Sequence, residues 1–239
     1  MKKVLCGIAC VAAGAALAVE PVTVATVEVR AVNSGLTNTI VAIPGLDLAT
    51  GDALAISNLV KTTNLAAGDM LYAFSNGEYE TWELVDTAGV KHWDKATYTC
   101  TISANGDRTD TGTSASSYTM SVGSGIWLSR KASGSTDAFY VYAQNPGSIG
   151  STSVAAGKTV LLGNPKATNA APTISGARSK DKIIVPTAGL PKYYNYSGTV
   201  WQSVTGAEVT SSETPPSITA GTGFWYKASE ASGTRTITW

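Results

Sequence analysis

The 239-residue sequence has little of the chemistry that catalysis and metal binding require. It contains one histidine, His92, and three cysteines, and charged residues make up only 14% of it. A structural zinc site needs four Cys, His or carboxylate ligands, and a catalytic triad needs a histidine beside a positioned serine. No Gly-x-Ser-x-Gly motif, which presents the nucleophilic serine in one large class of hydrolases, occurs in the chain. These shortages argue against an enzyme. Because Cys6 and Cys10 lie in a leader-like segment that we expect to be removed, the one Cys and one His that remain exclude a structural zinc site.

Long apolar runs are also missing after the first residues. The chain begins MKKVLCGIACVAAGAALA, in which Lys2 and Lys3 precede an apolar run that ends at the small-x-small step before Val19. This pattern is typical of a secretory signal peptide. We expect residues 1–18 to be removed and the mature chain to be exported, to the periplasm, the cell surface or the medium. No later run reaches the roughly 20 apolar residues that a transmembrane helix needs.

Cleavage would leave a chain without disulfides and nearly without net charge. Cys6 and Cys10 leave with the leader, so Cys100 is the only remaining thiol. Removal of Lys2 and Lys3 from the 17 basic residues leaves 15 against 17 acidic ones. The remaining Lys and Arg residues are scattered, with Arg130-Lys131 the only adjacent pair. Nucleic-acid binding requires a basic stripe, so that partner is excluded. No motif predicts a cofactor, and the partners left open are envelope proteins and glycans.

What the sequence does contain is a succession of short alternating runs. Examples are NTIVAI, DMLYAF, YETWELV, GIWLSR, KTVLLG, DKIIVP, KYYNY and GFWYKA, separated by Asn-Gly, Ser-Gly, Thr-Gly and Pro turn signals. Alternation of apolar and polar residues over four to eight positions predicts β-strands, and helical periodicity is nearly absent. The fold class is therefore predicted to be all-β.

A repeated motif divides the mature chain in two. SVGSGIWLSRKA, from Ser121, matches ITAGTGFWYKA, from Ile218, and LYAFSNGEYETWEL resembles YYNYSGTVWQSV, with Trp82 in the place of Trp201. Internal self-similarity predicts repeated structural units. We expect two related antiparallel β-units, sandwich or barrel-like, at 19–147 and 148–239, packed as one fused body. A polar insertion near 104–118 belongs to the first unit.

The second half resembles a largely uncharacterised β-module of exported bacterial proteins. The resemblance is carried by Gly163-Asn164-Pro165, the aromatic hairpin with Trp201 and the Gly-x-Gly-Phe-Trp strand, and it covers roughly residues 158–239. In the first half Ile43-Pro44-Gly45 stands in place of the Gly-Asn-Pro motif. The resemblance implies export and β-architecture, and it implies no chemistry.

The two Gly-x-Gly motifs are interpreted as structural. Such a motif binds phosphate when it precedes a helix, but here it precedes a strand. A turn with one glycine at positive φ is the expected role, and the tryptophan that follows is predicted to fill a core. The residues assigned to this structural set are Gly123, Gly125, Trp127, Gly163, Asn164, Pro165, Gly221, Gly223 and Trp225.

Two further sets of residues are candidates for binding. Aromatic rings near predicted hairpins stack against sugars when their faces are exposed, and the candidates are Tyr79, Trp82, Trp201 and Tyr226. Oxygen ligands in the polar insertion, Asn105, Asp107 and Asp110, form a calcium candidate, although the terminal bidentate acid of a regular calcium loop is missing.

No residue is assigned a catalytic role. His92 and Asp94 share a predicted strand face, as do Glu78 and Glu80, but both pairs are expected on solvated surfaces. Arg235 interrupts the apolar alternation of the last predicted strand. The function that we expect is that of an exported, non-catalytic structural or adhesive protein of the envelope or surface. A carbohydrate-binding module and a secreted hydrolase are the alternatives.

Overall fold

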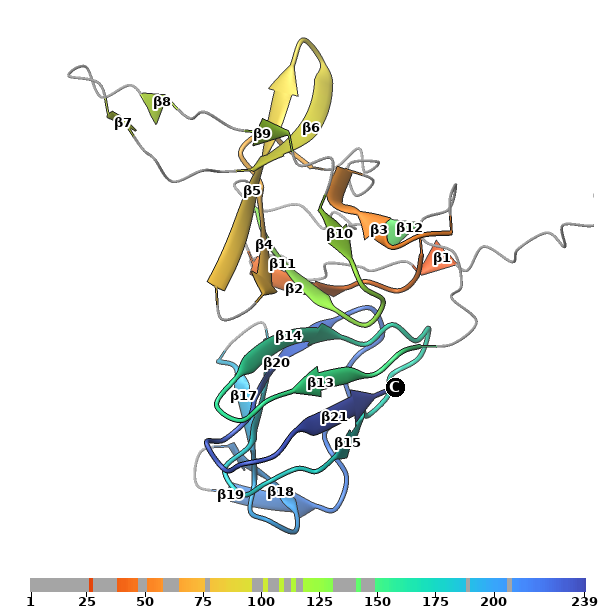
Figure 1. Ribbon diagram of the computed structural model, residues 1–239, viewed down its shortest axis with the longest axis vertical. Helices are drawn as coiled ribbons and strands as arrows, with labels where there is room; N and C mark the ends of the chain where they lie inside the picture. Colours follow the sequence, from red (N-terminus) through yellow and green to blue (C-terminus); the bar gives the residue numbers. More distant parts are fainter. Residues whose placement is uncertain are drawn as a thin grey trace, which may run out of the picture.

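The computed structural model describes residues 26–27, 38–46, 51–57, 65–75, 78–95, 101–102, 108–109, 113–114, 118–130, 141–142, 149–187, 190–205 and 208–239. In these ranges the chain forms strands and turns, with no α-helix. The prediction of an all-β fold is confirmed. The elements form two halves that are stacked along the long axis of the molecule (Figure 1).

The first half holds a six-stranded antiparallel sheet in the order β2-β11-β4-β5-β6-β9. The bounds are β2 Asn38–Ala42, β11 Gly125–Ser129, β4 Met70–Ser75, β5 Glu78–Thr87, β6 Val90–Lys95 and β9 Thr113–Ser114. Three pairs of two-residue strands accompany it, namely β1 Thr26–Val27 with β12 Val141–Tyr142, β3 Leu54–Ala55 with β10 Thr119–Met120, and β7 Thr101–Ile102 with β8 Arg108–Thr109.

The second half holds a six-stranded antiparallel sheet in the order β14-β20-β16-β17-β18-β19. The bounds are β14 Thr159–Gly163, β20 Gly223–Lys227, β16 Lys182–Val185, β17 Lys192–Tyr196, β18 Trp201–Thr205 and β19 Glu208–Ser212. A three-stranded sheet in the order β13-β21-β15 lies beside it, with β13 Thr152–Val154, β21 Arg235–Thr238 and β15 Thr173–Ser175. Neither six-stranded sheet closes on itself.

The two large sheets share one strand order and one register at their centre. Trp127 on β11 pairs with Ile40 on one side and Tyr72 on the other. Trp225 on β20 pairs in the same way with Leu161 and Ile184. Counting outward from these strands, β2, β4, β5 and β6 take the places of β14, β16, β17 and β18. The internal repeat itself stays a prediction, but equivalent positions can be assigned from this shared pairing.

Each half has its own core, and alternate side chains of β11 and β20 point into the two cores. Ile126 and Leu128 are fully buried in the first core, and Phe224 and Tyr226 are fully buried in the second. Because successive side chains point to opposite faces of a strand, the tryptophan between each pair faces away from the core. The expectation that Trp127 and Trp225 fill the cores is corrected by this arrangement. Both indoles are half-buried and belong to neither core.

Candidate functional site

The Gly-x-Gly motifs form the turns that lead into β11 and β20. Gly123 and Gly221, the first glycine of each motif, have φ angles of 82° and 69°, which residues with a Cβ rarely adopt. Each turn is closed by a backbone hydrogen bond, from Ser124 N to Ser121 O (3.1 Å) and from Thr222 N to Thr219 O (3.1 Å). The expected turn at positive φ is therefore present in both motifs.

The same turns join the two halves reciprocally. The Ala42 N–H on β2 donates to the carbonyl of Gly221 (3.0 Å), and the Gly163 N–H on β14 donates to the carbonyl of Gly123 (2.9 Å). Ala42 and Gly163 occupy equivalent positions in their sheets, since each pairs with the second glycine of its own motif. The contact thus has the self-complementary form of a two-fold interface, here made within one chain.

The second glycine of each motif and Gly163 permit this close approach. A Cβ on Gly223 would overlap the side chain of Ile40, and a Cβ on Gly163 would overlap Ala42. On Gly125 it would lie 2.8 Å from the carbonyl oxygen of Leu162 in the other half. All three glycines are fixed by contacts between the halves, which explains the motif without a ligand.

Asn164 and Pro165, the remainder of the Gly-Asn-Pro motif, are buried. The Asn164 side-chain amide donates to the carbonyls of Ile218 (2.8 Å) and Thr168 (3.0 Å), and its oxygen accepts from Lys166 N (3.0 Å). The side chain therefore ties the turn after β14 to the segment that precedes the Gly-x-Gly motif.

The two outward-facing tryptophans meet between the halves. The ring centroids of Trp127 and Trp225 lie 6.4 Å apart at an interplanar angle of 75°. Phe74 and Tyr79, from the β4–β5 hairpin, contact Trp225 at 5.2 and 5.9 Å, and Tyr72 contacts Trp127 at 6.0 Å. Edge-to-face geometry at these distances is favourable for aromatic pairs. We name these five residues the inter-half aromatic cluster.

An apolar pocket adjoins this cluster. Its volume is about 190 Å³, and it is lined by Thr39, Ile40, Trp127, Ile184, Pro186, Pro191 and Trp225. The lining comes from both halves, and apart from the Thr39 hydroxyl and the two indole N–H groups its side chains are apolar. The sequence predicted neither the pocket nor its prolines, because Pro186 and Pro191 read as turn signals and their meeting with Trp127 depends on how the halves dock.

The four ligand candidates proposed from the sequence are separated by the fold. Tyr79 is 49% exposed and belongs to the inter-half aromatic cluster, and burial raises its pKa. Trp82, Trp201 and Tyr226 are 1%, 3% and 0% exposed, so they present no open ring face to a sugar. Because these three rings are buried in the two cores, the expectation that they stack against a sugar is corrected.

A second depression lies over β18 and β19. It has a volume of about 400 Å³ and hydroxyl-rich walls, formed by Tyr194, Trp201, Ser203, Thr210, Ser211, Ser212, Thr214, Ser217, two prolines and one alanine. Tyr194 is half-buried, and Trp201 is buried. We call this depression the hydroxyl groove.

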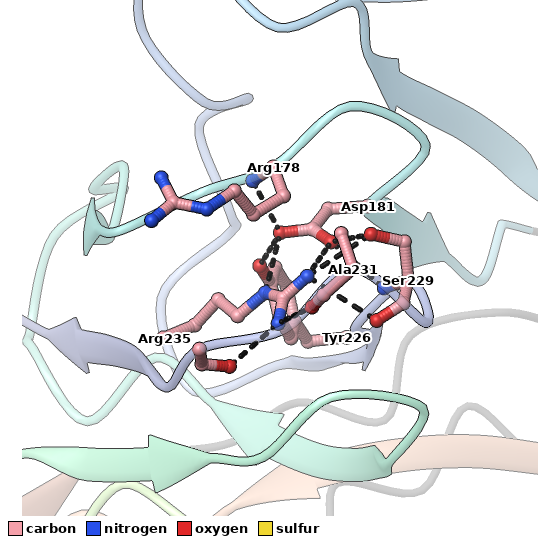
Figure 2. Close-up of polar contacts among 7 residues, drawn as sticks. Arg178, Asp181, Tyr226, Ser229, Ala231 and Arg235 are labelled. Carbon is pink, nitrogen blue, oxygen red and sulfur yellow. Dashed lines mark hydrogen bonds and ion pairs between the residues drawn. The ribbon is translucent and has the colours of Figure 1, made fainter.

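A buried hydrogen-bond network surrounds Asp181, which lies just before β16 (Figure 2). Its carboxylate is buried and accepts bonds from Arg235 Nη2 (2.9 Å) and Nε (3.1 Å), from the Tyr226 hydroxyl (2.6 Å) and from Ser229 N (2.8 Å). The Arg178 N–H and the Ser229 hydroxyl complete the set. Burial raises the pKa of Asp181, but hydrogen bonds from Arg235, Tyr226 and the backbone outweigh this and hold it at about 2.

This network is suited to structure and not to proton transfer. Both carboxylate oxygens are fully engaged, and Arg235 also donates to the carbonyls of Ala231 and Gly233. Burial and the bond to Asp181 raise the pKa of Tyr226 well above its usual value, so its proton is retained. The sequence held a partial signal for this network, because Arg235 interrupts an apolar strand and turns out to be buried.

Three of the residues considered for catalysis, His92, Asp94 and Glu80, lie at the surface of the first half. His92 Nε2 is 3.5 Å from Asp94 Oδ1, and both side chains are partly exposed. Glu80 Oε2 is 3.4 Å from Lys95 Nζ on the neighbouring strand. The calcium candidates Asn105, Asp107 and Asp110 lie outside the described residues. Within the described ranges, no three His, Cys, Asp or Glu side chains gather as a metal site would require, and no helix is long and apolar enough to span a membrane.

Comparison of the chain with protein-family models, with curated proteins and with solved structures finds no match.

Proposed function

We propose that the chain is an exported, non-catalytic protein with a structural or adhesive role in the cell envelope or at the cell surface. The leader-like residues 1–18 and the resemblance to an exported β-module support the location. The observation that carries the role is the reciprocal joint between the halves, in which Ala42 and Gly163 donate to Gly221 and Gly123. Two sheets fixed in this way form one stiff body, which suits a scaffold or an adhesin.

The test is binding of the purified, exported protein to envelope preparations of the source organism. Saturable binding is expected, and the His92→Ala variant, altered at a partly exposed residue remote from the joint, should bind equally well. Absence of saturable binding to envelopes or to intact cells would remove the adhesive role. Turnover of an ester, peptide or glycoside substrate that disappears in His92→Ala would favour a hydrolase instead.

Carbohydrate binding is the second candidate, and the hydroxyl groove favours it. Serine and threonine hydroxyls offer hydrogen bonds to a sugar, and the half-buried Tyr194 beside them offers apolar contact. If this candidate holds, soluble polysaccharides should compete with envelope binding, and Thr210→Val and Ser203→Ala should weaken it. Binding that survives every polysaccharide competitor would exclude the groove as the main contact.

A further inference from the structure

The apolar pocket exists because the two halves differ at equivalent positions. Tyr72 pairs with Trp127 as Ile184 pairs with Trp225. Phe74 pairs with Tyr79 one step beyond the pair of Ala73 and Glu80. Pro186 and Pro191 stand one step beyond the equivalent pair of Val185 and Lys192. The first half therefore has Tyr, Phe and Tyr at the three positions where the second half has Ile, Pro and Pro.

This difference leaves the surroundings of the two tryptophans unequal. Trp225 lies against the rings of Phe74 and Tyr79. The equivalent space beside Trp127 is bordered by Pro186 and Pro191 and is open, with a volume of about 190 Å³. Apolar cavities of roughly 150 Å³ take up benzene, so the space has the size of one aromatic ring. The other half of the same molecule fills the equivalent space with such rings.

Three exposed apolar side chains adjoin residues that line this pocket, and we call them its rim. Tyr79 contacts both tryptophans and is 49% exposed, Tyr193 pairs with Ile184 and is 46% exposed, and Leu190, which precedes Pro191, is 89% exposed. Large apolar groups gathered on one surface are typical of sites that bind macromolecules. A partner that covers this rim, and not a free small molecule, suits the surface.

Two lysines lie on the same sheet face as the pocket-lining residues Ile184 and Trp225, at a fixed spacing from them. Lys182 and Lys227 are exposed and pair across β16 and β20, two residues along from the pair of Ile184 and Trp225. Two residues of extended chain span about 7 Å, and side chains two apart share one face. A ligand strand that inserts a ring into the pocket would therefore bring a residue near both ammonium groups, which favours a carboxylate there.

We propose that the pocket binds a Phe or Tyr side chain from an extended, acidic segment of a partner protein, with an Asp or Glu about two residues away held by Lys182 and Lys227. This inference rests on the proposed adhesive function for its biological meaning, since it names the partner class. The chemistry of recognition rests only on the pocket, its rim and the two lysines.

The experiment measures tryptophan fluorescence and NMR shifts of the full exported chain with capped peptides Ser-Phe-Ser-Asp-Ser. A dissociation constant in the millimolar range or below is expected from burial of one ring. Replacing the Phe by Ala should weaken binding roughly tenfold, and replacing the Asp by Asn should weaken it several-fold and remove its salt dependence. Equal binding of the Ala peptide would overturn the proposal, and so would uptake of toluene without binding of the Phe peptide.

Two protein variants give an independent check. Pro186→Phe with Pro191→Tyr copies the first half and should fill the pocket, so peptide binding should be lost. Lys182→Gln with Lys227→Gln changes only exposed side chains, should leave the melting temperature unchanged, and should weaken binding of the Asp peptide but not of the Asn peptide. Retention of full binding by the lysine variant would refute the proposal even if the filled variant fails to fold. A protein that binds the peptide but no envelope would keep the pocket and lose only the adhesive function.

Discussion

Trp127 and Trp225 hold equivalent positions in the two halves and lie against each other across the interface, with ring centroids 6.4 Å apart. Each indole faces away from the core of its own half. Trp225 contacts Phe74, Tyr79 and Trp127 of the first half, and Trp127 contacts Trp225 across the interface and Tyr72 and Tyr79 beside it. The tryptophan of each Gly-x-Gly motif therefore contributes to docking of the halves more than to the interior of either one.

Replacing Trp225 by alanine should consequently destabilise the docked protein. The indole is half-buried and contacts Phe74, Tyr79 and Trp127, so we expect a loss of about 3 kcal/mol in the free energy of unfolding. Denaturant unfolding followed by circular dichroism measures it. Tyr193→Ala, at a similarly large but more exposed ring, should change stability by less than about 0.5 kcal/mol. Equal effects of the two variants would contradict the role in docking.

Gly223→Ala tests the close approach of the halves directly. The added Cβ would overlap the side chain of Ile40 and lie 2.6 Å from the carbonyl oxygen of Leu162, so the joint must open. We expect a loss of about 3 kcal/mol, measured by thermal and denaturant unfolding. Gly150→Ala is the matched control, because a Cβ there meets no heavy atom within 4 Å. A Gly223→Ala protein as stable as the control would show that the halves do not need this contact.

The alternation of the sequence was sufficient to predict an all-β chain. The repeated Gly-x-Gly motif marked β11 and β20, which hold the same place in the two strand orders. Neither signal determined which aromatic hairpins correspond. The similarity of 71–84 to 193–204 aligns Trp82 with Trp201. The strand pairing instead makes Trp93 the equivalent of Trp201. Trp93 pairs with Leu84, and Trp201 pairs with Tyr196 at the equivalent position. Hairpins with aromatic strands look alike locally, and a strand's position in a sheet is set by pairing with distant segments.

The same limit explains the misplaced tryptophans and the missed pocket. Both faces of GIWLS and GFWYK are apolar, so alternation separates Trp127 from Ile126 and Leu128 without telling which face is inside. Similarly, the Gly-Asn-Pro match is one residue out of step, because the pairing of Ala42 with Gly125 aligns Pro44 with Pro165. Contacts between halves depend on docking, which leaves no periodic signal in the sequence.

Asn164→Ala should be among the more damaging polar substitutions in the second half. It removes three hydrogen bonds and leaves the buried carbonyl of Ile218 with only the bond from the Ala170 N–H. The expected loss is about 2 to 3 kcal/mol. Asn169→Ala, which removes one bond from the Ala220 N–H at an exposed site, should lose less than about 1 kcal/mol. Hydrogen exchange of the amides near Ile218 should accelerate only in the Asn164 variant, and acceleration in both would argue against a specific tie.

The buried pair of Asp181 and Arg235 should give the protein a defined acid limit. The pKa of Asp181 is about 2 in the folded chain against an ordinary value of 3.8, so the carboxylate stabilises the fold above about pH 4 and this contribution is lost as the pH falls through 2. The shift corresponds to about 2 kcal/mol of stability. Asp181→Asn should lose about 3 kcal/mol at neutral pH, because the Arg235 guanidinium stays buried without its counter-ion, and its stability should vary less between pH 4 and 2. Asp94→Asn, at a partly exposed carboxylate, should keep the acid dependence of the unmodified protein. Parallel loss of stability between pH 4 and 2 in the unmodified protein and in Asp181→Asn would assign the acid limit to other carboxylates.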